Sequence, residues 1–164
     1  MVKNQGILYI SCGVPGSGKS TFLNKIKGEN EIIVSRDEIR FSLLKPGENY
    51  FAHEEEVFRL FCNKIADYIK QGKNVYADAT HLTIMSRNKL LTSVKRRCAP
   101  SKICLLLFII PLKICLERNE YRKGTKAYVP EDKVIQMYSN FNKDTNGYDA
   151  CFQINENGDI QRII

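Results

Sequence analysis

The chain has 164 residues, a net charge of +7 and 43% hydrophobic residues. This length and composition are typical of a single folded domain, here residues 1–164, and argue against global disorder. The first five residues are polar, and the longest apolar stretch, residues 103–110, is far shorter than the ~20 residues that cross a bilayer. We therefore expect a soluble, cytoplasmic protein without a secretory leader, a membrane partner or an obligate protein partner.

The six cysteines form no C-x-x-C pair, and His53 and His81 are the two histidines of the chain. This spacing does not match a zinc site, and several cysteines lie inside apolar runs. We predict buried, reduced thiols that behave as small hydrophobic side chains.

The positive charge is concentrated in residues 85–126, which contain eleven Lys or Arg and two Glu. A basic segment of this kind can bind a polyanion such as nucleic acid. It can equally be a solvated surface that also supplies ligands for nucleotide phosphates. Charge alone leaves both interpretations open.

Strands and helices are predicted to alternate from the start of the chain. The apolar residues 6–12 predict a buried strand, a helix follows from Ser20, and residues 31–35 predict a second strand. A short helix near Asp37 and a loop at Pro46-Gly47 come next.

The alternation continues with an amphipathic helix over residues 53–71, a strand over 74–78 and a helix over 83–98. Residues 103–110 are the clearest core strand. The pattern predicts a parallel sheet that is covered by helices on both faces.

Proline marks the start of two later helices. One is predicted to run from Pro111 towards Arg122, and another begins at Pro130 after a loop. The last two strands, residues 149–154 and 160–164, flank the turn-forming pair Asn157-Gly158 and predict a hairpin.

The strongest motif is GVPGSGKS at residues 13–20, which matches G-x-x-x-x-G-K-S/T between a predicted strand and a predicted helix. Its glycines allow backbone N–H groups to surround phosphate oxygens, and the following helix adds its positive end. Lys19 is expected to reach the β and γ phosphates, and the Ser20 hydroxyl to bind Mg²⁺. The predicted cofactors are ATP and Mg²⁺, held by Gly13, Gly16, Ser17, Gly18, Lys19, Ser20 and Thr21.

A phosphate acceptor needs a group that orients its hydroxyl, and Asp37 is the best candidate. It follows the second predicted strand, at the sheet edge where α/β proteins bind ligands, and Arg40 shares its helix face. Asp37 could then accept the hydroxyl proton while Arg40 binds a substrate phosphate. The alternative is that Asp37 merely caps its helix and pairs with Arg40.

The strand over residues 74–78 ends in Asp78, with Thr80 and His81 just beyond it. Asp78 could support Mg²⁺, anchor Arg40 or cap a turn. We expect Asp78, Thr80 and His81 to contribute to the substrate site, although His81 could be an ordinary loop histidine.

Arg118 and Arg122 are four residues apart, on one face of a helix that leads into a loop. Arginines in this setting can stabilise the charge of a transferring phosphate, although exposed helices also carry arginines for solubility. We expect the pair to be catalytic.

These pieces together resemble the bacteriophage-type polynucleotide 5′-hydroxyl kinases, within the P-loop kinase group. The resemblance implies a three-layer α/β P-loop NTPase/kinase fold with a central parallel sheet and a small helical lid over residues 118–129. The matching blocks are GVPGSGKST at 13–21, SRDEIR at 35–40, VYADATHL at 75–82 and RNEYRKGTKAYVP at 118–130.

The resemblance implies that Asp37 is the general base for the acceptor hydroxyl and that Arg40 contacts the acceptor's neighbouring phosphate. Asp78 would support Arg40 and the acceptor site, whereas Arg118 and Arg122 would belong to the lid. Two features of the sequence depart from the family, since His81 replaces a frequent Asn and the lid helix is one residue longer. We also expect no attached phosphatase or ligase domain.

The sequence is compatible with three functions. The first is a kinase for the 5′-hydroxyl end of DNA or RNA, the second a kinase for a small acceptor such as a nucleoside, sugar or antibiotic, and the third a non-catalytic nucleotide-binding module. A GTPase is disfavoured because residues 142–145, NKDT, lack the spacing of the N-K-x-D guanine signature. ATP is therefore the expected donor.

Overall fold

The computed structural model describes residues 4–164, so residues 1–3 of the predicted domain lie outside the described part. One six-stranded sheet has the order β2-β3-β1-β4-β5-β6. Neighbouring strands from β2 to β5 are parallel, and β6 is antiparallel to β5, which confirms the parallel sheet and the C-terminal hairpin. The strands are β1 (Leu8–Cys12), β2 (Glu31–Ser35), β3 (Asn74–Asp78), β4 (Ile103–Phe108), β5 (Ala150–Ile154) and β6 (Ile160–Arg162).

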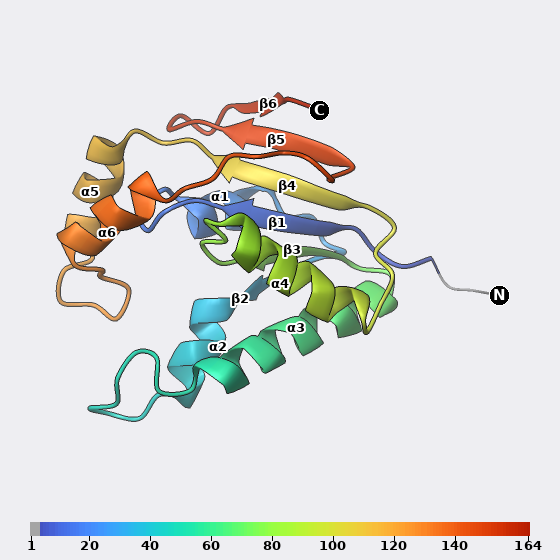
Figure 1. Cartoon of the computed structure of the whole chain (residues 1–164), viewed down its shortest axis with the longest axis horizontal. Coiled ribbons are helices and arrows are strands. Elements are labelled where there is room, and N and C mark those ends of the chain that lie inside the picture. The colour runs from blue at the N-terminus through green and yellow to red at the C-terminus, as the bar shows by residue number, and fades with distance from the viewer. Residues whose placement is uncertain (1–3) are drawn as a thin grey trace.

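Helices cover both faces of the sheet, which confirms the predicted three-layer α/β fold. Side chains of α3 and α4 share one buried cluster, and side chains of α1 and α5 share a second cluster on the other face. Figure 1 shows α4 in front of the sheet and α1 behind it. The helices are α1 (Lys19–Ile26), α2 (Arg36–Leu43), α3 (Glu54–Lys70), α4 (Ile84–Lys95), α5 (Leu112–Glu120) and α6 (Glu131–Ser139).

The strand ends differ from the prediction where backbone groups find other partners. The predicted first strand began at Gly6, but the Gly6 amide bonds the carbonyl of Ile69 and the strand begins at Leu8. The predicted core strand over 103–110 ends at Phe108. No helix among residues 4–164 has the length and apolar character needed to cross a membrane. All six cysteines are buried and free, as predicted.

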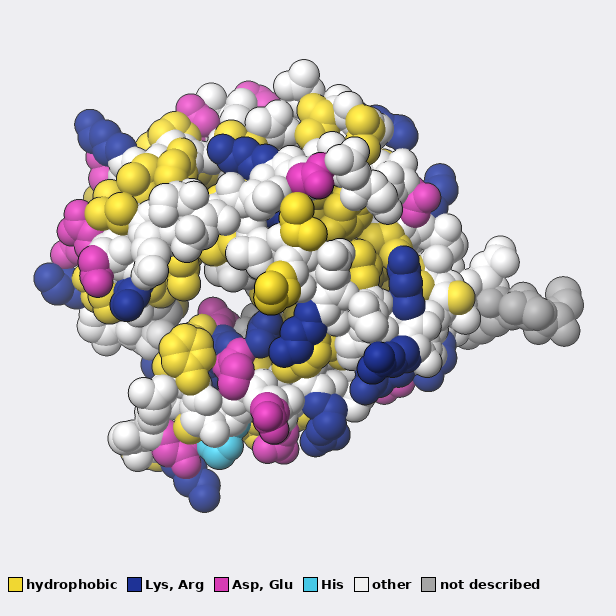
Figure 2. Space-filling view, in the orientation of Figure 1, with side chains coloured by type: hydrophobic (Ala, Val, Ile, Leu, Met, Phe, Trp, Pro, Cys, Tyr) yellow, Lys and Arg dark blue, Asp and Glu magenta, His cyan; other side chains and the backbone are white. Residues whose placement is uncertain are grey.

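The strand order creates a binding edge at the carboxyl end of β1. The chain leaves β1 for β2 on one side and reaches β4 on the other, and ligands of such sheets bind where the order reverses. In Figure 1 the α2–α3 loop and the α5–α6 loop both extend from this end of the sheet. Figure 2 shows a hollow in the surface between these two parts.

A buried arginine ties two loops together behind this edge. Arg87 is 1% exposed and donates to the carbonyl oxygens of His81, Leu82, Asn142 and Asp144. The amide of Asn142 also donates to the carbonyl of Leu82 over 2.8 Å. The segment that follows α6 is therefore fastened to the turn between β3 and α4.

Candidate active site

The loop over residues 13–18 joins β1 to α1 and has the shape of a phosphate cradle. Gly16 and Gly18 adopt φ values of 83° and 88°, which L side chains rarely adopt. A Cβ atom on Gly16 would lie 2.3 Å from the carbonyl oxygen of Cys115, and one on Gly13 would lie 2.7 Å from Ser17 Oγ. The loop thus needs its glycines, and its shape fits a triphosphate at the helix N-terminus.

Lys19 begins α1 and folds back over this loop. Its Nζ donates to the carbonyl oxygens of Gly13, over 2.8 Å, and Val14, over 3.2 Å. Burial lowers the pKa of the Lys19 ammonium, which the Asp78 carboxylate opposes, while Arg122 lowers it further and Asp37 raises it. Three residues of the predicted site, Asp37, Asp78 and Arg122, therefore influence the pKa of Lys19.

The Ser20 hydroxyl donates a 2.6 Å hydrogen bond to Asp78 Oδ2. The Asp78 side chain comes from the end of β3 and is 6% exposed. A hydroxyl and a carboxylate are oxygen ligands of the kind that Mg²⁺ prefers, so this pair fits the predicted ion. The predicted anchoring of Arg40 by Asp78 is wrong for the described residues, because the carboxylates that Arg40 contacts are those of Asp37 and Glu54.

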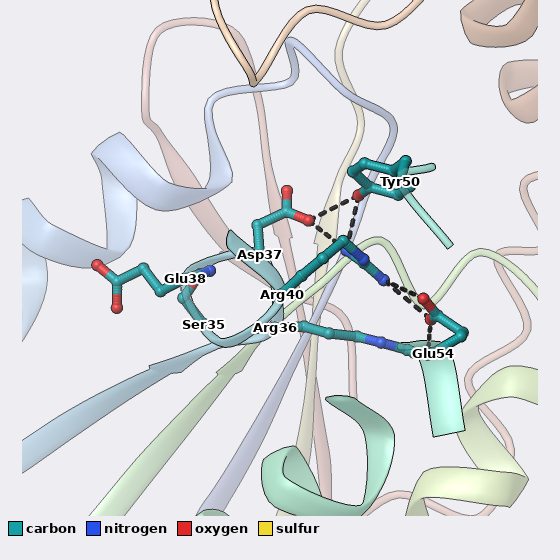
Figure 3. Close-up of polar contacts among 7 residues, drawn as sticks. All are labelled: Ser35, Arg36, Asp37, Glu38, Arg40, Tyr50 and Glu54. Atoms are coloured by element: carbon teal, nitrogen blue, oxygen red, sulfur yellow. Dashed lines mark hydrogen bonds and ion pairs between the residues drawn. The ribbon is translucent and has the colours of Figure 1, made fainter. Parts of the chain in front are cut away.

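Asp37 and Arg40 lie one helical turn apart at the start of α2, and Figure 3 shows them directed toward Tyr50. Asp37 accepts hydrogen bonds from Arg40 Nη1 and, over 2.7 Å, from the Tyr50 hydroxyl. Its side chain is 55% exposed. The N-cap of α2 is Ser35, which accepts from the amide of Glu38, so the alternative that Asp37 caps the helix is wrong. Its predicted pairing with Arg40 is confirmed.

Glu54, the first residue of α3, fixes the position of Arg40. Arg40 Nη2 donates to both carboxylate oxygens of Glu54 over 2.9 Å, and Arg36 pairs with the same carboxylate. The Arg40 guanidinium also lies 4.2 Å from the centroid of the Tyr50 ring. Sequence reasoning missed Tyr50 and Glu54. Tyr50 lies in a loop, and an acidic residue such as Glu54 is common at a helix N-terminus, so neither carries a specific signal.

The predicted lid arginines come from α5 and the turn after it. Arg118 Nη1 donates to the carbonyl of Ser17 over 3.2 Å, which brings Arg118 against the phosphate loop. The buried Asn119 donates to the carbonyl of Val129 over 2.6 Å and accepts from its amide. Asn119 therefore closes the loop between α5 and α6, a role without a sequence signal.

The two residues predicted beyond Asp78 lie in different surroundings. Thr80 contributes its carbonyl, which accepts from the amide of Gly13 over 3.0 Å and holds the start of the phosphate loop. His81 is 4% exposed, and its Nδ1 donates to the carbonyl of Ser11 over 2.8 Å. Burial lowers the pKa of His81 to about 4. The expected substrate contact by His81 is therefore wrong, because its buried ring bonds the Ser11 carbonyl and stacks on the Phe61 ring, with 6.0 Å between the ring centroids.

Thr21 and Ser17 complete the predicted nucleotide set. Thr21 is exposed in the first turn of α1, and Ser17 is buried with its Oγ 3.5 Å from Lys19 Nζ. The structure thus brings the donor-side residues, Asp37 and the lid arginines to one end of the sheet. It leaves His81 out.

Comparisons with known proteins agree with this geometry. A family model described as AAA domain matches residues 8–143. A protein of Autographa californica nuclear polyhedrosis virus, provisionally named a bifunctional polynucleotide kinase/RNA ligase, is 27% identical over 154 residues. The match covers 85% of this chain and 21% of that protein, so the chain spans about a fifth of its relative's length.

Two solved structures show the breadth of the fold. A chain in the structure of the Pnkp1/Rnl/Hen1 RNA repair complex superposes with a TM-score of 0.71 at 22% identity, covering 84% of this chain and 44% of the other. A gluconokinase from Sinorhizobium meliloti 1021 superposes with a TM-score of 0.58 at 18% identity, covering 93% and 82%. Both resemblances concern the fold alone. Given the phosphate loop and the match over most of its length, the chain belongs to the AAA domain family and has a P-loop α/β fold.

Proposed function

We propose that this chain transfers the γ-phosphate of ATP to the 5′-hydroxyl end of DNA or RNA. The observation that most directly supports transfer to a hydroxyl group, whatever molecule carries it, is the contact between Asp37 and the hydroxyl of Tyr50, 2.7 Å apart. A carboxylate that already receives a hydroxyl hydrogen bond, close enough to Lys19 to act on its pKa, is suited to accept the proton of an attacking hydroxyl.

The phosphate loop would bind ATP, the phosphate donor. Its backbone amides and Lys19 would bind the β and γ phosphates, and Ser20 and Asp78 would hold Mg²⁺. Bound Mg²⁺ neutralises phosphate charge and orients the phosphate oxygens. Arg118, which contacts the loop through Ser17, would add positive charge where the transferring group carries it.

The acceptor side would position the hydroxyl and take its proton. The acceptor oxygen forms a bond to the γ-phosphorus, the bond from that phosphorus to the bridging oxygen breaks, and ADP leaves. The proton of the hydroxyl moves to the carboxylate of Asp37. Arg40, held in place by Glu54, would bind the phosphate adjacent to the acceptor's 5′ end.

We further propose that residues 1–164 work as one kinase domain in which residues 118–129, with Arg118 and Arg122, act as a lid. Closure of the lid would exclude water and limit hydrolysis of ATP. ATP as the donor and six free cysteines support a cytoplasmic location.

The polynucleotide acceptor is supported by the relative named a polynucleotide kinase and by the basic segment over residues 85–126. The second candidate is a kinase for a small acceptor. The position of Tyr50 favours this second candidate. The Tyr50 ring covers Arg40 and its hydroxyl donates to Asp37, so both contacts leave less room for a large acceptor beside these residues.

The test incubates the protein with γ-labelled ATP, Mg²⁺ and short 5′-hydroxyl DNA and RNA oligonucleotides. We expect label on the 5′ end, a loss of about 100-fold or more in Asp37→Asn with ATP binding retained, and loss of transfer in Lys19→Ala. Glu38→Gln is the matched control, since Glu38 is in the same helical turn and points away from Tyr50 (Figure 3). No label on any oligonucleotide, with label on a metabolite such as a sugar, would establish the second candidate.

A further inference from the structure

An open groove of about 730 Å³ runs along α4 beside Phe58 of α3, and it does not include the site residues described above. Its lining includes Phe58 from α3 and, from α4, Met85, Asn88, Lys89 and Arg96. Met85 is 81% exposed, so the groove presents an apolar side chain to solvent next to polar and positive ones.

The charge of this groove is of one sign. No Asp or Glu occurs between Asp78 and Glu117, so α4 and both of its flanking turns carry no negative charge. None of the residues that line the groove is acidic, whereas Lys89 and Arg96 are basic and exposed. Figure 2 shows Lys and Arg side chains gathered over this part of the surface. Such a groove is complementary to a polyanion.

The groove lies next to the acceptor side of the active site. Arg36 pairs with Glu54, the carboxylate that also holds Arg40. The guanidinium of Arg36 lies 5.4 Å from the centroid of the Phe58 ring, and Lys89 Nζ lies 4.6 Å from the same centroid. The Phe58 ring therefore contacts both Arg36, on the acceptor side, and Lys89, in the groove.

We propose that the groove along α4 binds the strand of the polynucleotide acceptor that trails from the 5′ end held at Asp37. The proposal rests on the proposed function and names the path of its substrate. The strand would pass Phe58 and continue along α4 from its start, at the carboxyl edge of the sheet, towards Arg96.

The side chains of the groove suit a single strand of mixed sequence. Lys89 and Arg96 are seven residues apart, about 10.5 Å along a helix, which corresponds to about three nucleotides of stacked strand. Their charges would bind phosphates, which gives affinity without base specificity. Met85 offers apolar contact for a base, and Asn88 and Thr92 offer side-chain hydrogen bonds.

The experiment compares acceptors of different length in the full chain. Steady-state phosphorylation and fluorescence anisotropy are measured with single-stranded 5′-hydroxyl DNA of two, four, eight and twelve nucleotides, for the wild type and for Lys89→Gln, Arg96→Gln and the double variant. We expect KM and Kd of the wild type to fall with length and then to level off. We expect the double variant to lose most of this gain, by about tenfold on the longer strands, and to treat the dinucleotide as the wild type does.

Two further variants separate the proposal from effects on folding. Thr92→Lys adds a charge between Lys89 and Arg96 and should tighten binding of the longer strands several-fold, a gain that a folding defect cannot produce. Lys25→Gln removes the same charge from the last turn of α1, on the other face of the sheet, and should change nothing. The dependence of log Kd on log salt should become shallower by about 0.7 for each phosphate contact that is removed.

The outcomes distinguish this proposal from the function on which it rests. If all lengths are phosphorylated equally well and the groove variants behave as the wild type, the strand path is wrong while the kinase activity stands. If no oligonucleotide is phosphorylated or bound, both proposals fail. If the groove variants retain oligonucleotide binding but abolish binding of an acidic protein, the groove serves a protein partner and the strand path is overturned.

Discussion

The hydroxyl of Tyr50 donates to Oδ1 of Asp37 over 2.7 Å, and the same hydroxyl accepts from Arg40 Nη1 over 2.6 Å. Burial, together with the hydrogen bond to Asp37, raises the pKa of Tyr50 above its ordinary value, so the phenol stays protonated. Tyr50 thus contacts both residues that we assign to the acceptor, and it competes with an acceptor hydroxyl for Oδ1 of Asp37.

The first prediction concerns this competition. Tyr50→Phe keeps the ring over Arg40 and removes the hydroxyl, so we expect KM for the acceptor to fall by up to about fivefold, the worth of one hydrogen bond of about 1 kcal/mol. The turnover number should change less than twofold. Steady-state kinetics with varied acceptor test this, and a loss of turnover as large as that of Asp37→Asn would show that Tyr50 takes part in the reaction instead.

The second prediction separates the roles of Asp78 and Arg40. Because Asp78 pairs with Ser20, both Asp78→Asn and Ser20→Ala should raise the Mg²⁺ concentration for half-maximal activity by about 10-fold or more. Arg40→Ala should raise KM for the acceptor and leave the Mg²⁺ response unchanged. The measurement is a Mg²⁺ titration at saturating ATP; a shift in Arg40→Ala equal to that in Asp78→Asn would contradict the assignment.

The third prediction concerns the lid arginines. Arg118→Ala and Arg122→Ala should each lower the turnover number by about 100-fold, the typical effect of removing one group that stabilises developing charge. Lys123→Ala is the control, because Lys123 is exposed and forms its ion pair with Glu120 of the same helix end. Equal effects of all three changes on turnover would argue for a disrupted loop and against a specific arginine role.

The fourth prediction is a pH dependence of stability. Burial lowers the pKa of His81 from 6.5 to about 4, so the folded state holds a neutral ring that the unfolded chain protonates more readily. The stability that depends on this neutral ring is complete above pH 6.5 and falls by up to about 3 kcal/mol as the pH decreases towards 4.

The variant His81→Asn isolates this contribution. Asn tolerates the positive φ of 42° and can still donate to the carbonyl of Ser11, so the variant should fold. Urea unfolding of both proteins at pH 7, 6, 5 and 4 should show the wild type losing stability relative to the variant below pH 6.5. Parallel pH profiles of the two proteins would be the contrary result.

The sequence was sufficient for the parts of the site that depend on local spacing. The phosphate loop needs glycines at fixed positions between a strand and a helix, and the alternation of strands and helices predicts the sheet that presents it. The pairing of Asp37 with Arg40 could also be predicted from the sequence, because residues three apart share a helix face.

The remaining contacts depend on tertiary structure and leave no local pattern. Glu54 and Tyr50 reach Arg40 from 14 and 10 residues away, through a loop whose path the sequence does not encode in any spacing. For His81 the sequence predicted a contact that does not form. Because His81 is close to Asp78 in the chain, we expected both side chains to face the substrate at the same edge of the sheet. The His81 side chain is instead buried against the carbonyl of Ser11, a tertiary contact that the chain spacing does not reveal.

The buried Arg87 has a consequence for motion of the α5–α6 segment. Because Arg87 and Leu82 hold the backbone at Asn142, that point belongs mechanically to the sheet and to α4. At its other end the segment leaves β4, whose strand is hydrogen-bonded on both sides. Both ends of the segment are therefore attached to the sheet. Closure of the proposed lid would be a rotation about the line that joins these two ends, and Arg118 and Arg122 would move with the lid.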